Sequence, residues 1–430
     1  MFSKCLISLL AIANFASTTL GGPVTNAKVI NAGGESTIPG HYIVVYKPGI
    51  TDAAADAHTN RINSFQANMG KRGIKDKWKF SKTGFRGYSG EFNDDTLAEI
   101  LKSPEVNYVE QDAVVNVKAE ILDKRDYLAN STWGLDRISH TASGEPWAYY
   151  YDSVAESPNI TAYVVDTGIR VTHEKFLDYI TGETRAFWGT NTIDSLDTDG
   201  NGHGTHCAGT IGAETYGVNR RVKLVAVKVL DSNGDGTLSS VISGVGWVVA
   251  NAIPNLSVMN MSLGSPKSTS MNDAVESAVS AGITVVVAAG NDGVNAKNSS
   301  PASAPNVITV GAIDKQWWAA TNKYTFPIAS FSNYGTTLDI FAPGVDVVST
   351  WATSDNATEY LDGTSMAAPH VAGLAVYFMG MAGPSGLSPA SVLNEINSNA
   401  VTGQITGNLH SSPNRIAFND YCTTGAGCAT

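Results

Sequence analysis

Three residue types that together support nucleophilic catalysis occur in this chain in the order Asp, His, Ser. Asp166 directly follows the apolar run at 162–165, where a carboxylate needs hydrogen-bond donors around it. His203 lies in NGHGTH, residues 201–206, where glycines let backbone or a substrate come close. Ser365 lies in GTSMAAPH, residues 363–370, where a helix is expected to begin. A histidine that is held by a carboxylate can take the proton of a serine hydroxyl and activate it.

A fourth residue, Asn291, follows the apolar run at 283–290. Its side-chain amide could donate a hydrogen bond to an oxyanion, beside the backbone N–H of Ser365 at the helix start. Taken singly, each of the four has an ordinary structural interpretation. Asp166 and Ser365 could cap a helix or lie in a turn, and GNDG at 290–293 is a good turn sequence. Their common order and their positions at predicted strand and helix ends favour a catalytic site.

The same segments would also be compatible with two other chemistries, metal binding and aspartic protease catalysis. His203 and His206 lie three residues apart, but His-Glu-x-x-His is absent and no third metal ligand is spaced nearby. Asp166-Thr167-Gly168 is also typical of aspartic proteases, which need two such blocks to share a proton between carboxylates. The sequence contains one Asp-Thr-Gly block and no Asp-Ser-Gly block, so an aspartic protease is not favoured.

Alternating strands and helices are predicted to position these residues. The strands are Val- and Ile-rich runs without polar alternation, which is typical of a parallel sheet buried on both faces. They predict one α/β domain over 126–430, with a doubly wound, mostly parallel sheet flanked by helices and a site at the carboxyl ends of the strands. The predicted strands are 162–165, 224–230, 258–263, 283–289 and 307–310, and the predicted helices are 203–213, 238–250, 272–280 and 365–379.

The first part of the chain has a different organisation. Residues 1–21 resemble a signal peptide, with Lys4 followed by an apolar run that is too short to span a bilayer. Residues 22–125 contain a small α+β domain at about 36–117, and the pair Lys124-Arg125 in the following polar joint is an expected processing site. The predicted elements of the small domain are strands 41–46, 85–92 and 106–115 and helices 51–69 and 95–102.

Bulk composition narrows the possible partners. The net charge of −11 over 430 residues argues against nucleic acid, because an acidic chain gains nothing from counterion release. No later apolar run reaches about 18 residues, so no membrane partner is expected. Cys422 and Cys428 are close enough in sequence for a disulfide in an oxidising compartment, whereas Cys207 has no evident partner. Glycosylation sequons begin at Asn130, Asn159, Asn255, Asn260, Asn298 and Asn356, of which Asn260 is expected to be buried and unmodified.

Three segments carry a resemblance to a known family: VVDTG at 164–168, HGTHCAGT at 203–210 and GTSMAAPH at 363–370. They resemble the signature blocks of subtilases, and the chain is most similar to the proteinase K group of secreted fungal proteases. The resemblance covers residues 133 to about 417. The first segment resembles the subtilase propeptide, which is an inhibitor and folding assistant. The resemblance implies a serine endopeptidase that is synthesised as a zymogen and acts through an acyl-enzyme.

The resemblance also implies roles for further residues. An extended substrate would pair with an edge segment, apolar pocket walls would suit an aliphatic or aromatic P1 side chain, and oxygen ligands would hold a structural calcium ion. No cofactor is expected for catalysis. The edge segment is Gly234, Asp235, Gly236 and Leu238; the walls are Ser262, Leu263, Gly264, Ala288, Ala289 and Gly290; the calcium ligands are the Pro305 and Val307 carbonyls and the Asp339 carboxylate.

The expected partners are protein or peptide substrates and the chain's own propeptide, with the enzyme a monomer outside the cell or in a vacuole. The alternative is an inactive secreted homologue that acts as a binding protein. Such a protein would be expected to lack one member of the triad, and Asp166, His203 and Ser365 are all present. Cys207, four residues after His203, is expected to pack beneath the histidine.

Overall fold

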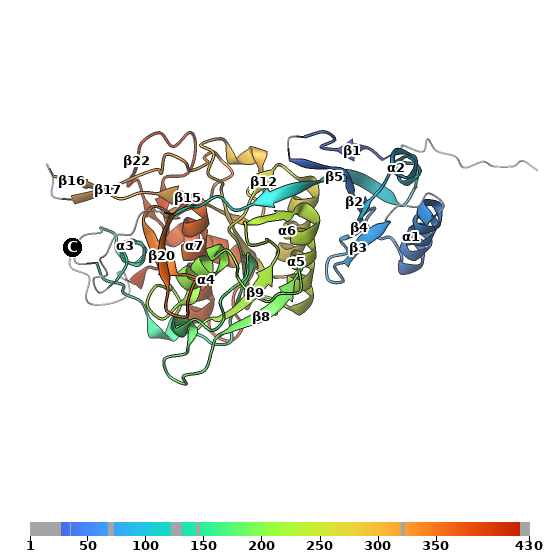
Figure 1. Ribbon diagram of the computed structural model, residues 1–430. Helices are drawn as coiled ribbons and strands as arrows, with labels where there is room; N and C mark the ends of the chain where they lie inside the picture. Colours follow the sequence, from blue (N-terminus) through green and yellow to red (C-terminus); the bar gives the residue numbers. More distant parts are fainter. Residues whose placement is uncertain are drawn as a thin grey trace, which may run out of the picture.

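The computed structural model describes residues 27–34, 36–67, 73–121, 131–142, 147–319 and 323–421. The predicted signal peptide, the Lys124-Arg125 pair, the sequon at Asn130, and Cys422 and Cys428 lie outside these ranges. Figure 1 shows a small N-terminal domain beside a larger one. No helix in the described ranges is long and apolar enough to cross a membrane.

The N-terminal domain is a sheet covered by two helices, and its last strand continues toward the large domain. The sheet order is β1-β5-β2-β4-β3. The elements are β1 (Val29–Ile30), β2 (Thr37–Tyr46), α1 (Asp52–Ala67), β3 (Ile74–Lys79), β4 (Arg86–Glu91), α2 (Asp94–Leu101) and β5 (Val106–Asn116). Strand β6 (Glu120–Ile121) follows this domain and pairs with a strand of the large domain.

The large domain is built on a nine-stranded sheet in the order β21-β23-β18-β15-β13-β11-β7-β9-β8, parallel throughout except between β21 and β23. Its sheet strands are β7 (Thr161–Asp166), β8 (Ala186–Asn191), β9 (Lys223–Lys228), β11 (Ser257–Met261), β13 (Thr284–Ala288), β15 (Ile308–Ile313), β18 (Ile340–Pro343), β21 (Val401–Thr402) and β23 (Arg415–Ile416). The other strands are β10 (Asp235–Thr237), β12 (Ser265–Pro266), β14 (Ser299–Ser300), β16 (Gln316–Trp318), β17 (Lys323–Pro327), β19 (Val347–Thr350), β20 (Thr358–Asp362) and β22 (Ile405–Thr406). The helices are α3 (Trp133–Arg137), α4 (His203–Gly212), α5 (Leu238–Asn251), α6 (Thr269–Ser280), α7 (Thr364–Met381) and α8 (Pro389–Asn399).

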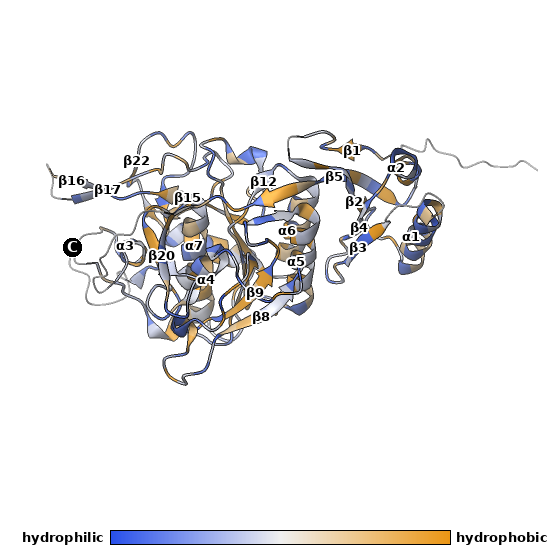
Figure 2. Ribbon diagram, viewed as in Figure 1, coloured by the Kyte–Doolittle hydropathy of each residue, from blue (hydrophilic) through white to orange (hydrophobic). Residues whose placement is uncertain are grey.

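Helices cover both faces of this sheet, as the uninterrupted apolar strands predict. Along β7, Val164 packs into the core with α4 and α7, whereas Val165 packs into the core with α5 and α6. Figure 2 shows hydrophobic residues concentrated in the strands between these helices. The expected α/β architecture is therefore confirmed, and its strands end near the predicted site residues.

The N-terminal domain packs against the outer side of α5 and α6 (Figure 1). Trp78 on β3 donates a hydrogen bond from Nε1 to Ser243 Oγ on α5 at 2.9 Å. Two carboxylates of β5 accept hydrogen bonds from backbone N–H groups at the helix starts, which is where a negative charge is favoured. Glu110 accepts from Ser270 of α6 at 2.7 Å, and Asp112 accepts from Ser239 of α5 at 3.2 Å.

The N-terminal domain contains more strands than the predicted β-α-β-α-β order. Strands β1 and β3 were not predicted, and the predicted strands at 41–46, 85–92 and 106–115 correspond to β2, β4 and β5. The reason for missing β3 is its sequence, IKDKWK, in which Trp78 alone is buried. It lies at the edge of the sheet, where one face is open to solvent and charged residues are tolerated.

Candidate active site

Asp166 and His203 meet where the last residue of β7 faces the first residue of α4. His203 Nδ1 lies 2.8 Å from Asp166 Oδ1, which also accepts the Thr167 N–H at 2.7 Å. Both side chains are buried. With Nδ1 directed at the carboxylate, Nε2 is the nitrogen that can accept a proton, and it has no hydrogen-bond partner within the described ranges. Burial alone lowers the pKa of His203, but the Asp166 carboxylate raises it well above the ordinary value.

Two glycines of the NGHGTH segment allow this close approach. Gly202 has φ of 110°, and a Cβ there would lie 2.6 Å from the Trp351 ring. A Cβ on Gly204 would collide with the Gly168 carbonyl that follows β7. Glycine at both positions therefore lets α4 begin directly against the end of β7, as the sequence led us to expect.

Asp199 was not singled out from the sequence, although it lies close before His203 in DGNGHG. Its buried carboxylate accepts hydrogen bonds from Thr167 Oγ1 at 2.8 Å, Gly202 N at 2.8 Å and Thr205 N at 2.9 Å. It therefore ties the residue after Asp166 to the first turn of the helix that carries His203.

Ser365 is the second residue of α7 and is buried. Its hydroxyl donates to the Ser262 carbonyl at 3.1 Å, so it is not hydrogen-bonded to His203 in this conformation. The Ser262 hydroxyl donates in return to the Ser365 carbonyl at 2.8 Å, and Asn260 Nδ2 donates to Ser262 Oγ at 3.0 Å. Asn260 is fully buried in this network, which confirms the expected burial of that side chain.

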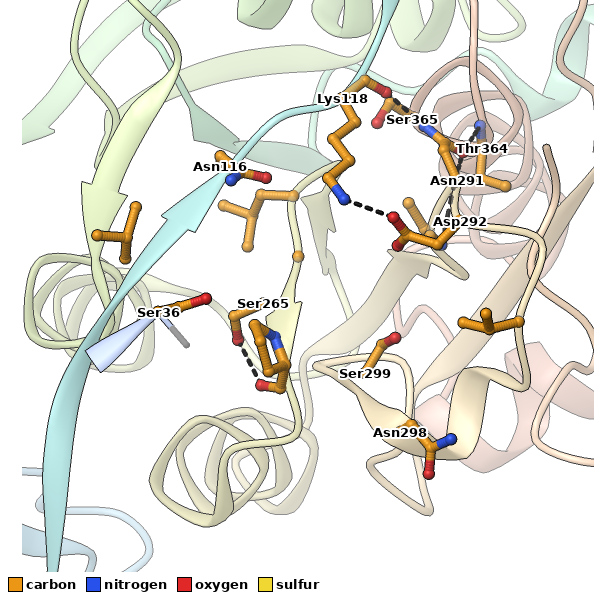
Figure 3. Close-up of a pocket in the computed structure, with 17 residues that line it drawn as sticks. Ser36, Asn116, Lys118, Ser265, Asn291, Asp292, Asn298, Ser299, Thr364 and Ser365 are labelled. Carbon is orange, nitrogen blue, oxygen red and sulfur yellow. Dashed lines mark hydrogen bonds and ion pairs between the residues drawn. The ribbon is translucent and has the colours of Figure 1, made fainter. Parts of the chain in front are cut away.

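Asn291 lies beside the start of α7, and its amide orientation is fixed by Thr364, which was not predicted as a site residue. Asn291 Oδ1 accepts from Thr364 N at 2.8 Å and from Thr364 Oγ1 at 2.6 Å. The amide nitrogen therefore points away from α7, and it donates to the backbone carbonyl of Lys118 (Figure 3). Lys118 follows β5 of the N-terminal domain.

Cys207 packs beneath His203, as expected, with Sγ 3.9 Å from His203 Nδ1 and 3.5 Å from the Ser365 carbonyl oxygen. The side chain is fully buried, and burial raises the pKa of its thiol. A neutral thiol therefore fills the space between the first turns of α4 and α7.

A cavity of about 360 Å³ lies beside Ser365. Leu263, Ala288 and Val294 provide apolar walls, and the acidic side chain of Asp292 also lines it (Figure 3). Gly264 and Gly290, two further predicted wall residues, line it as well. The predicted residues Ala289 and Leu238 are instead buried in separate core clusters.

The predicted edge segment carries a paired strand. Asp235, Gly236 and Thr237 of β10 pair antiparallel with Asn116, Val115 and Val114 of β5. On the opposite side, Gly264 N and Asn116 O are 3.1 Å apart, and Asn116 N and Gly264 O are 3.2 Å apart. The end of β5 is therefore the middle strand of three, with β10 on one side and the cavity wall on the other.

The predicted calcium ligands are distributed around the start of β15. Asp339 accepts a hydrogen bond from Thr309 N at 2.8 Å, and burial raises the pKa of its carboxyl to about 6. Pro305 is exposed and Val307 is buried, both immediately before β15.

Comparison with known families gives two matches. Residues 158–415 match the Subtilase family of peptidases, and residues 41–118 match peptidase inhibitor I9. The second match covers the N-terminal domain up to Lys118.

Whole-chain relatives give the same assignment. A cuticle-degrading serine protease of Arthrobotrys oligospora is 53% identical over 98% of this chain and 100% of its own length. Subtilisin-like protease 2 of Pseudogymnoascus destructans is 45% identical over 97% of this chain and 98% of its own. The crystal structure of a cold-adapted subtilisin-like serine proteinase matches with a TM-score of 0.59 and 38% identity, covering 68% of this chain and 99% of that one. The chain therefore belongs to the subtilase family, as a serine protease with an I9 propeptide that makes it a zymogen.

Proposed function

We propose that Asp166, His203 and Ser365 are the catalytic triad of a secreted endopeptidase and that Asn291 is a donor of its oxyanion site. The observation that carries this proposal is the pair of contacts at the two ends of the site. His203 Nδ1 lies 2.8 Å from Asp166 Oδ1. The Asn291 amide donates to the backbone carbonyl of Lys118, in a segment that lines the same cavity as Ser365.

In this mechanism Ser365 Oγ attacks the substrate carbonyl carbon while His203 Nε2 takes its proton. For this step the Ser365 hydroxyl, which donates to the Ser262 carbonyl in this conformation, must turn toward His203. The oxyanion is stabilised by the Asn291 amide and the backbone N–H of Ser365. His203 then gives the proton to the leaving amine, and a water molecule releases the acyl group.

The apolar walls of the cavity favour an aliphatic or aromatic P1 side chain, held while the substrate backbone pairs with 234–236 and Gly264. Two relatives carry the name cuticle-degrading serine protease, one from Arthrobotrys oligospora and one from Orbilia oligospora. We extend that name to this chain as a proposal: its substrates include the proteins of a cuticle. Broad use of extended polypeptides is consistent with recognition through the backbone.

The precursor is divided in our proposal into a signal peptide at 1–21, a propeptide at 22–125 and a peptidase at 126–430, secreted and monomeric. The propeptide acts as an intramolecular inhibitor, because it covers the cleft. Neither nucleic acid nor a membrane is a partner of the acidic mature enzyme.

A calcium ion is proposed to bind Asp339 with the Pro305 and Val307 carbonyls. The donor set fits a hard cation, because all three ligands are oxygens. The half-buried Asp339 carboxylate, with its pKa raised to about 6, is also a group that a cation would stabilise. Calcium would supply stability and no catalytic step. A chelator should lower the melting temperature of the wild type, and Asp339→Asn should abolish that decrease. The same decrease in the variant as in the wild type would contradict a calcium site at Asp339.

The test of the proposed mechanism uses matured wild type and a chromogenic peptide with a large apolar P1 residue. A serine-reactive phosphonate should abolish turnover, and its mass should be found on the peptide that contains Ser365. Ser365→Ala should lose activity on the order of 10⁶-fold, a magnitude measured on a subtilisin, whereas the exposed control Ser153→Ala should not. Full activity of Ser365→Ala would overturn the triad and favour a binding protein.

A further inference from the structure

Asn291 lies in a turn that follows β13, and this turn is held by a residue from another part of the chain. Residues 292–294 of the turn are exposed, so packing in the core does not fix them. The residue that holds the turn is Asn333, which lies between β17 and β18 and is fully buried. We refer to residues 289–294 as the Asn291 turn.

Both polar atoms of the Asn333 side chain bond to backbone groups on either side of Asn291. Oδ1 accepts from Asp292 N at 3.1 Å and from Val294 N at 3.0 Å. Nδ2 donates to the Ala289 carbonyl at 2.9 Å. One carboxamide therefore joins the residues before and after Asn291, and it uses both lone pairs of its oxygen to do so.

The backbone of Asn333 adds a further contact, at Gly290. Asn333 N donates to the Gly290 carbonyl at 2.9 Å. Gly290 has φ of 102°, and a Cβ there would lie 2.3 Å from Asn333 Nδ2, so only glycine permits this approach. The N–H of Gly290 donates to Thr364 Oγ1 at 3.1 Å. Gly290 is thus fixed between Asn333 and the start of α7.

The Asn291 side chain is fixed separately from the backbone that carries it. Its amide oxygen accepts from Thr364, and its amide nitrogen donates to the Lys118 carbonyl in the cleft (Figure 3). The backbone on either side of Asn291 is held by Asn333. An oxyanion donor is effective when its position is fixed before the charge develops, because no reorganisation is then needed during the reaction.

We propose that Asn333 is a positioning residue for peptide hydrolysis, which holds the Asn291 turn so that the Asn291 amide meets the oxyanion. The proposal rests on the proposed function, since it requires Asn291 to be the oxyanion donor. Asn333 is fully buried, so it acts through Asn291 and not on the substrate. Its removal should therefore lower kcat, because a small misplacement of a reacting group can cost about 10²-fold in rate.

The experiment measures kcat and KM of matured enzyme on the chromogenic peptide with an apolar P1 residue. The concentration of active sites is taken from the final stoichiometry of phosphonate labelling at Ser365, so unfolded protein is not counted. Asn333→Ala should lower kcat per active site by about 10- to 100-fold. Asn333→Asp keeps the shape and the acceptor but loses the donor to Ala289, so it should also lower kcat, and it serves if Asn333→Ala does not fold.

The matched control is Asn219→Ala. Asn219 is also fully buried, and its Nδ2 donates to the Ala155 carbonyl at 2.9 Å, away from the Asn291 turn. The control should have a lower melting temperature, as expected when a buried amide is lost, but wild-type kcat per active site. Wild-type kcat in both Asn333→Ala and Asn333→Asp, or the same loss of kcat in Asn219→Ala, would overturn the proposal.

A double-mutant cycle with Asn291→Ala distinguishes positioning from a general structural role. When the Asn291 amide is already absent, adding Asn333→Ala or Asn333→Asp should lower kcat by less than about twofold. A structural role independent of Asn291 would give the same factor in both backgrounds, and this result would contradict the proposal. The pH midpoint of kcat/KM should stay at the wild-type value in the Asn333 variants, because Asn333 acts through Asn291 and not through His203. A shifted midpoint would also overturn it.

The same cycle separates this proposal from the function on which it rests. Wild-type kcat in Asn291→Ala would overturn the oxyanion assignment and the positioning proposal together. A lowered kcat in Asn291→Ala, with equal factors for Asn333→Ala in both backgrounds, would overturn the positioning proposal alone and leave the peptidase mechanism intact.

Discussion

Asn291 is hydrogen-bonded both to the start of α7 and to the segment that lies in the cleft. Its amide oxygen is occupied by two hydrogen bonds from Thr364, so the amide nitrogen can only point into the cleft. Thr364 also begins the helix that carries Ser365. The proposed oxyanion donor and the proposed nucleophile are thus positioned by one helix start, which limits how far either can move relative to the other.

Replacing this donor should lower turnover more than binding, because an oxyanion forms only during the reaction. Asn291→Ala is expected to reduce kcat about 10²- to 10³-fold, a range established on a subtilisin, with KM nearly unchanged. Steady-state kinetics on matured enzyme measure this split. Asn306→Ala, an exposed asparagine on the same domain, is the matched control. A rise in KM at constant kcat would mean that Asn291 binds substrate and does not stabilise the transition state.

The pH dependence of activity should reflect His203. The proposed base must be neutral, and the Asp166 carboxylate raises the pKa of His203 well above its ordinary value. The protonated, inactive form is therefore favoured at acidic pH, and kcat/KM should rise toward alkaline pH with a midpoint above about 6.5. Asp166→Asn should lower both the midpoint and the rate. A wild-type profile that is flat from pH 5 to 9 would contradict His203 as the base.

Several residues of the site could be predicted because a local pattern marks them. Asp166, His203, Ser365 and Asn291 each follow or begin an element that is readable from apolar runs and glycines. The ion pair of Lys118 and Asp292 could not be predicted from such a pattern. Its two residues lie far apart in sequence and come into contact only because the end of β5 lies in the cleft. The hydrogen bonds of Asp199 are similar, since they depend on the exact path of a loop that no periodicity describes.

At the scale of elements, burial decided what could be predicted. Strands β7, β9, β11, β13 and β15 are covered on both faces, so their sequences are mostly apolar and do not alternate with exposed polar residues. Strand β3 has a single buried side chain, and the hairpin of β16 and β17 is mostly exposed. Neither therefore has the apolar run by which the buried strands were predicted. The six predicted helices correspond within a few residues to α1, α2, α4, α5, α6 and α7, and the caps of α5 and α6 are a threonine and a serine. Helices α3 and α8 were not predicted.

The contact between β5 and the two helix starts is a prediction at this scale. Glu110 is buried and accepts hydrogen bonds from the first turn of α6, at 2.7 Å from Ser270 N and 3.2 Å from Thr269 N. Glu110→Ala leaves these donors without a partner while the propeptide is bound. Hydrogen bonds to a charged group contribute about 1.5–3 kcal/mol each, so the cleaved propeptide should dissociate at least about tenfold faster.

The lag before activity appears in processed full-length protein measures this dissociation. Asp95→Asn, an exposed carboxylate on α2 of the same domain, should leave the lag unchanged. If Glu110→Ala and Asp95→Asn gave the same lag, the helix-start contact would not contribute to inhibition.

At the scale of the whole molecule, the propeptide is held by two different kinds of contact. Its folded domain packs on α5 and α6, whereas its last residues lie in the cleft as a substrate would. A cut between the two domains would release the strand end from covalent attachment but would leave the domain contact in place. Inhibition after the cut therefore depends on the stability of the folded propeptide domain.

A buried histidine makes that stability depend on pH. His58 on α1 has its Nε2 2.9 Å from the Tyr88 hydroxyl and its Nδ1 3.2 Å from Arg61. Burial, and then the charge of Arg61, lowers the pKa of His58 to about 4, although Glu105 opposes the shift. The unfolded domain binds a proton near pH 6.5, whereas the folded domain does not. The stability from His58 is thus complete above that pH and is lost progressively as the pH falls toward 4, by up to about 1.4 kcal/mol per unit.

We expect the propeptide domain of the Ser365→Ala precursor to open more readily at pH 5 than at pH 7. Amide hydrogen exchange of β2 and β4, corrected for the intrinsic rates, measures the opening free energy at each pH. His58→Gln should flatten this dependence, because the remaining side chain does not titrate, whereas the exposed control His410→Gln should keep the wild-type slope. Identical slopes for wild type and His58→Gln would show that other groups, and not His58, make the propeptide sensitive to acid.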